Sequence, residues 1–129
     1  MLNRTAIVAA IGGLIAFPLA AYADAASEIA TAAQHAGLAA KAPDLRQTHM
    51  HLHEAMNCLV GPLDGDFDKA NANPCAQQGK GAFPDEGNPD FKVKLQNVMS
   101  LVADGIASGD AAAAQKAAAT AETQLNAIK

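Results

Sequence analysis

Aromatic side chains are scarce in this chain, which has no Trp, 1 Tyr and 4 Phe. Positive charge is scarce as well, because 9 Lys and Arg stand against 13 Asp and Glu. Nucleic-acid binding depends on basic patches, and stacking on bases or sugars depends on aromatic rings. The composition therefore argues against a nucleic-acid partner and against a stacking sugar site.

Signatures of common active and cofactor sites are also missing. The chain has no Cys-x-x-Cys-His run, which excludes covalently attached c-type haem and leaves non-covalent haem with His/Met ligands open. No Ser stands near a His/Asp pair, as nucleophilic catalysis would favour. The acidic run from Asp64 to Asp68 fails the EF-hand pattern, because Lys69 and Cys75 stand where Gly and Glu are required. A solvated turn fits this run better than a looser calcium site, and we expect no enzymatic activity.

The N-terminal segment has the three parts of a secretory signal. Arg4 supplies the positive charge, 6–19 form an apolar stretch, and Ala-Tyr-Ala at 21–23 is a small-x-small cleavage site. The alternative, a transmembrane anchor, would need a longer apolar run followed by a charged cluster. We therefore predict cleavage before Asp24, one domain over 24–129, and a periplasmic or secreted protein without membrane attachment.

The two cysteines, Cys58 and Cys75, have two alternative interpretations. An even pair in an exported protein favours a disulfide, which would add about 3 kcal/mol of stability in the chain-entropy model. The alternative is a pair of metal-binding thiolates, which an oxidising compartment disfavours. We predict the disulfide.

Apolar residues recur at helical spacing in four segments, and the sequence between the second and third is rich in Gly and Pro. The three-residue connection near Pro43 makes the first two helices antiparallel. We predict an all-α fold, an antiparallel four-helix bundle of two helical hairpins, with a long disulfide-pinned loop between helices 2 and 3. The Ala-rich stripes imply a thin core and leave a homodimer open. The expected helices are 25–41, 44–60, 90–108 and 110–128, with an irregular loop over 61–88.

His and Met crowd into the second helix, which holds three of the four His. His49 and His53 are one turn apart and share a face, the geometry by which two imidazoles bind one metal ion. Met56 lies close to the same face. His51 points to the opposite side and is expected to be solvated, and Met50 falls between.

His35 lies on the first helix, almost as far from the turn near Pro43 as His49 and Met50 are. In an antiparallel pair these positions reach the same level, so His35 can complete a site with His49 and His53. Imidazole suits copper, zinc and nickel, whereas thioether suits Cu⁺. We therefore predict a metal ion, copper first and zinc second. The predicted ligands are His49, His53 and Met56, with His35 and Met50 as further candidates.

The spacing Met50-x-x-His53-x-x-Met56 resembles the motif of small periplasmic silver- and copper-binding proteins of metal-resistance systems. The resemblance covers seven residues, once. It implies that Met50, His53 and Met56 bind Cu⁺ or Ag⁺. The residues also allow a purely structural interpretation, in which Met56 fills the core and His49 lies at its edge. Two hypotheses follow: a metal-buffering or carrier protein, and a non-catalytic interaction module in which the His cluster is incidental.

Overall fold

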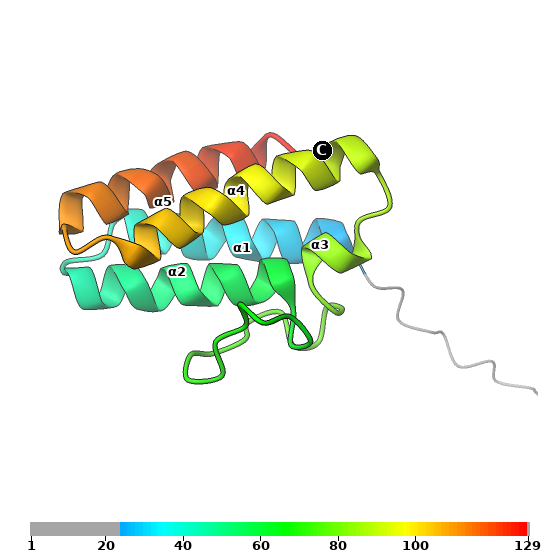
Figure 1. Cartoon of the computed structure of the whole chain (residues 1–129), viewed down its shortest axis with the longest axis horizontal. Helices are drawn as coiled ribbons and strands as arrows, with labels where there is room; N and C mark the ends of the chain where they lie inside the picture. The colour runs from blue at the N-terminus through cyan, green and yellow to red at the C-terminus, as the bar shows by residue number, and fades with distance from the viewer. Residues whose placement is uncertain (1–23, 129) are drawn as a thin grey trace, which may run out of the picture.

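The computed structural model describes residues 24–128, so the expected signal segment, 1–23, lies outside the described residues. Within 24–128 the chain forms five helices and no strand, and four long helices lie side by side (Figure 1). None of the described helices is long and apolar enough to cross a membrane. The all-α prediction is thus confirmed for these residues. The helices are α1 (Ala25–Ala40), α2 (Leu45–Val60), α3 (Ala82–Asp85), α4 (Pro89–Ala107) and α5 (Ala111–Asn126).

Local capping signals explain where the long helices begin. The side chain of Asp44 accepts a hydrogen bond from the backbone N–H of Gln47, and that of Asp110 accepts one from Ala113. Such caps satisfy N–H groups that have no partner within the helix. Asn88 caps α4 in the same way, and Pro89 follows at the first helical position. The predicted boundaries of these helices lie within two residues of the observed ones.

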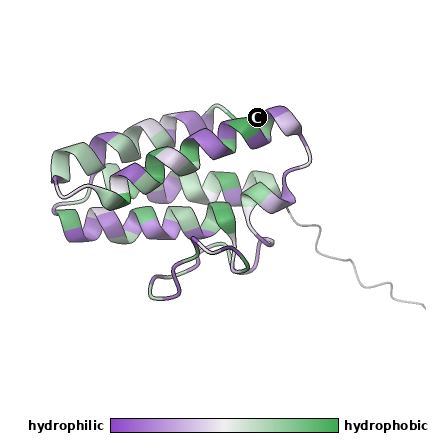
Figure 2. Ribbon diagram, viewed as in Figure 1, coloured by the Kyte–Doolittle hydropathy of each residue, from purple (hydrophilic) through white to green (hydrophobic). Residues whose placement is uncertain are grey.

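The core is built largely from small residues on α1 and α5. These two helices pack against each other, α1 also packs on α2, and α4 packs on both α5 and α2. Hydrophobic and hydrophilic residues alternate along each long helix, whereas the segment after α2 is mostly hydrophilic (Figure 2). Small side chains let helices approach closely but bury little area each, so larger residues of α2 and α4 supply much of the apolar burial. Fully buried are Ala32, Ala36 and Ala39 of α1, Ala114, Ala118 and Ala121 of α5, and Leu52, Leu59, Leu95, Val98 and Val102 of α2 and α4.

The segment between α2 and α4 is held to α2 at two neighbouring positions. Cys58 and Cys75 form a disulfide, as predicted. The fully buried Asn57 accepts a hydrogen bond from the backbone N–H of Asp68 and donates to the carbonyls of Asp68 and Ala72. One part of the prediction is wrong, because 61–88 is not irregular throughout. The single turn of α3 forms there, with its backbone bonds running from residues 85 and 86 to residues 81 and 82.

A buried carboxyl group joins α1 to the turn before α3. Glu28 is fully buried, and its Oε1 accepts a hydrogen bond from the backbone N–H of Gly81. Its Oε2 has no hydrogen-bond partner among the described residues, and the carboxyl group of Asp85 lies close to that of Glu28. Burial raises the pKa of Glu28, and the neighbouring charge of Asp85 raises it further. A proton on Glu28 removes the repulsion between the two carboxylates, because the protonated group can donate a hydrogen bond to Asp85.

We expect Glu28→Gln to stabilise the fold at neutral pH. The amide is neutral at every pH, and it can accept from Gly81 while donating to Asp85. Because the folded-state pKa of Glu28 is raised, the native state binds more protons than the unfolded state. The free energy of unfolding of the wild type then falls as the pH rises from 4.5, the ordinary pKa of a Glu side chain, through the raised pKa of Glu28. Urea denaturation of both proteins should show a difference in the free energy of unfolding that disappears below pH 4.5. If this difference does not change with pH, Glu28 does not carry a proton in the folded protein.

Candidate metal centre

Two imidazoles and one carboxylate meet between α1 and α2. Nδ1 of His35 donates to Oε2 of Glu54 over 2.8 Å, and Nδ1 of His51 donates to the same oxygen over 2.7 Å. Their potential ligand atoms all lie within 4.8 Å of one another. The side chains keep 17%, 20% and 13% of their surface exposed for His35, His51 and Glu54. These three residues, called here the His–His–Glu trio, are thus partly buried but open to solvent.

The turn between α1 and α2 places His35 and His51 at about the same height along the two helices. It spans residues 41–44, and the two helices that it connects pack against each other. His35 lies on α1 about as far from this turn as His51 lies on α2. His51 and Glu54 are three residues apart, which places them on one face of α2. His35 reaches across to α2, but its neighbours there are Glu54 and His51 rather than the predicted His49 and His53.

His49 and His53 do not join His35. Nε2 of His49 donates to the backbone carbonyl of Ser108, which caps the C-terminal end of α4, over 2.9 Å. Nδ1 of His53 lies 3.1 Å from Oδ2 of Asp68 in the segment after α2. Among the described residues, the trio is the group of three His, Cys, Asp or Glu side chains that could hold an ion. The structure therefore does not bring the three predicted imidazoles together.

The two predicted thioether ligands have different surroundings. Met56 keeps 5% of its surface exposed and belongs to the hydrophobic core, yet it also lines a groove between α2 and α4. Met50 is half-buried on α2. Neither belongs to the trio. Of the predicted imidazoles, His53 lines the same hollow as Met56, whereas His35 and His49 lie elsewhere.

The expectation that His51 is solvated is wrong, and the reason is the packing of α2. This helix contacts α1 on one side and α4 on another, so two of its faces are covered rather than one. His51, opposite His49 on the helix, is turned toward α1. Its ring centroid lies 5.9 Å from that of His35. The three-residue spacing of His51 and Glu54, which places both on one face of α2, is the sequence signal that points to Glu54 as a ligand.

The trio supplies the ligand types of a three-ligand metal site, and its potential ligand atoms lie within 4.8 Å of one another. Two imidazoles and one carboxylate, with water in the fourth position, form one of the known ligand sets of zinc. A tetrahedral ion with bonds of about 2.0–2.1 Å separates its ligands by about 3.3 Å. The observed separations of 2.7 and 2.8 Å are those of hydrogen bonds. Binding would therefore require both Nδ1 atoms to give up their protons and to move away from the carboxylate oxygen, as an ion replaces the two N–H bonds.

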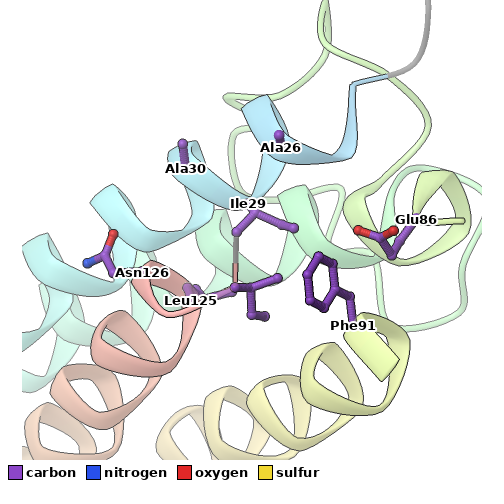
Figure 3. Close-up of a pocket in the computed structure, with 8 residues that line it drawn as sticks. Ala26, Ile29, Ala30, Glu86, Phe91, Leu125 and Asn126 are labelled. Atoms are coloured by element: carbon purple, nitrogen blue, oxygen red, sulfur yellow. The ribbon is translucent and has the colours of Figure 1, made fainter. Parts of the chain in front are cut away.

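An apolar pocket lies elsewhere, among α1, α4 and α5 (Figure 3). Its volume is about 270 Å³, and Ile29, Leu125 and Phe91 line it, with Glu86 and Asn126 at its edge. It contains neither His nor Met. The potential His and Met ligands on α2 thus lie outside this pocket.

Comparison with protein-family models, with curated proteins and with solved structures found no match to this chain.

Proposed function

We propose that this chain is an exported metal-binding protein that holds one divalent cation of borderline hardness at His35, His51 and Glu54. The observation that carries the proposal is the convergence of both Nδ1 atoms on one carboxylate oxygen. Imidazole suits Cu²⁺, Zn²⁺ and Ni²⁺, and a carboxylate in place of a thioether favours a divalent ion over Cu⁺. Because Cu²⁺ generally binds such ligands more tightly than Zn²⁺, copper remains the first candidate and zinc the second.

The proposed role is buffering or carriage of the ion rather than catalysis. The three ligands come from two helices joined by a short turn, and each side chain is partly exposed. An ion held there keeps a coordination position for water or for a ligand from a recipient molecule. Export rests on the signal-like residues 1–23, and the Cys58–Cys75 disulfide supports it, because such bonds persist in oxidising compartments.

We further propose that the four long helices form an antiparallel four-helix bundle of two hairpins, α1–α2 and α4–α5. The short connections, 41–44 and 108–110, and the packing of α1 on α5 and of α2 on α4 support this arrangement. In such a bundle, metal sites are built from side chains on facing helices. The trio fits that pattern, because it spans the two helices of the first hairpin.

A second candidate function is a non-catalytic interaction module. Leu63 keeps 91% of its surface exposed beside a pocket that Val60, Phe83 and Pro84 also line. An exposed large apolar side chain beside an apolar pocket is a feature of many contact surfaces. Under this hypothesis the trio serves only to fasten α1 to α2, and the chain takes up no metal ion.

Titration of the oxidised protein with Cu²⁺ and with Zn²⁺, in competition with a chromophoric chelator, tests the proposed function. We expect one equivalent of either ion to bind, and Cu²⁺ to bind more tightly. Glu54→Gln should weaken the binding of both ions by about tenfold or more, because the amide removes the negative charge but keeps an acceptor oxygen.

Glu122→Gln is the matched control, since it removes the same charge from α5. It should leave both affinities unchanged. If the wild-type protein binds neither ion, the metal-binding proposal fails and the interaction module becomes the better account. Equal weakening by both variants would show that net charge, rather than the trio, governs binding.

A further inference from the structure

A groove separate from the trio runs between α2, α4 and the segment after α2. Two adjoining hollows of about 240 and 410 Å³ form it, and both are lined by Met56, Asp66 and Ala103. His53 lines the smaller hollow, and Met99 lines the larger one. The groove therefore brings one imidazole and two thioethers to a common surface. Asp66 is exposed at its edge, where a carboxylate attracts cations.

His53 has a carboxylate beside its ring. Its Nδ1 lies 3.1 Å from Oδ2 of Asp68, a distance at which the imidazole and the carboxylate attract each other. Carboxylates next to a metal-bound imidazole are common outer-shell partners in metal sites. Nothing in the packing of an apolar core requires this pairing.

The carboxylate beside His53 is itself held in place. Asp68 accepts hydrogen bonds from the backbone N–H of Ala70 over 2.8 Å and from the side chain of Asn71 over 2.9 Å. The buried Asn57 fixes the backbone of Asp68 against α2. Asp68 therefore has a fixed position beside His53.

We propose that His53, Met56 and Met99 form a second metal site, selective for a soft monovalent cation of the Cu⁺ class. Thioether sulfur favours soft ions, and imidazole adds a ligand that Cu⁺ accepts. The site differs in chemistry from the trio, where a carboxylate replaces sulfur. It differs from the spacing Met50-x-x-His53-x-x-Met56 as well, because the second sulfur comes from α4 rather than from Met50. The two sites are independent, since they share no residue.

The methyl groups of the methionines report directly on this site. The protein is labelled with ¹³C at the methionine methyls, and Cu⁺ is added under nitrogen with ascorbate, which leaves the disulfide intact. We expect one equivalent of Cu⁺ to shift the methyl signals of Met56 and Met99, whereas that of Met50 should stay in place. Met99→Leu, which keeps an apolar side chain of similar size, should weaken Cu⁺ binding by about tenfold or more.

Met50→Leu is the matched control, because it removes a thioether from α2 outside the groove; Cu⁺ affinity should not change. The same titration of Glu54→Gln separates the two proposals, because the groove should still bind Cu⁺ when the trio is disabled. A Met50 signal that shifts as much as that of Met99, or no shift of Met56 and Met99, would overturn the soft-metal site. Neither result would affect the proposal for divalent ions at the trio.

Discussion

His51→Ala should abolish tight binding of Cu²⁺ and Zn²⁺, weakening it by about 100-fold or more. The substitution removes one of three ligands, whereas loss of a mere outer-shell partner already costs about 10–100-fold in affinity. His49→Ala should leave the affinity within about twofold, because His49 donates to the carbonyl of Ser108 and not to the trio. The two variants can be compared directly, because each removes one imidazole from α2 and the two positions are two residues apart.

Competition titration with a chelator measures both affinities, and a denaturation curve keeps folding separate from binding. His49→Ala should lower the free energy of unfolding by about 1 kcal/mol, through loss of one hydrogen bond. The outcome expected from helical spacing alone is the reverse, with His49 essential and His51 dispensable. If His49→Ala is the more damaging change for metal binding, the trio is not the site.

The second large effect concerns the contact between the end of α2 and the turn before α3. Gly61 has a φ of 75°, and a Cβ there would collide with the backbone carbonyl of Lys80. Gly61→Ala must therefore combine backbone strain with displacement of the segment that the disulfide and Asn57 hold in place. We expect it to cost about 3 kcal/mol or more, or to prevent folding.

Gly65→Ala is the matched control for this prediction. A Cβ at Gly65 would meet nothing within 4 Å, so stability should change by less than about 0.5 kcal/mol. Urea denaturation with the disulfide intact compares the three proteins. Equal midpoints for Gly61→Ala and the wild type would mean that residues 61 and 80 do not approach closely in solution.

Local sequence signals were sufficient for much of the fold. Asp44, Asn88 and Asp110 cap helices through hydrogen bonds to residues two or three positions away, so their effect is visible in the sequence. The disulfide follows from the pairing of Cys58 and Cys75 in a chain with a signal-like N-terminus. The turn of α3 was missed because four residues are too few to show a helical period.

The metal centre could be predicted only in part. Helical spacing places His51 and Glu54 on one face and His49 on another, but spacing does not say which face meets α1. That choice depends on how α2 is rotated between α1 and α4, a property of the whole packed domain. Asn57 holds the polar segment after α2 through the backbone of Asp68, and this segment lies beside His53. The sequence of α2 alone does not reveal this neighbour. Tertiary packing therefore decides which imidazole has a partner.

The most direct test of the central claim is the position of the ion itself. Crystals of the oxidised protein grown with Zn²⁺, measured on both sides of the zinc absorption edge, locate the metal by anomalous difference density. The account predicts one strong peak, about 2.0–2.2 Å from Nδ1 of His35, from Nδ1 of His51 and from a carboxylate oxygen of Glu54. A structure in which Glu54 still accepts both imidazole N–H bonds while zinc lies elsewhere on the chain would contradict it.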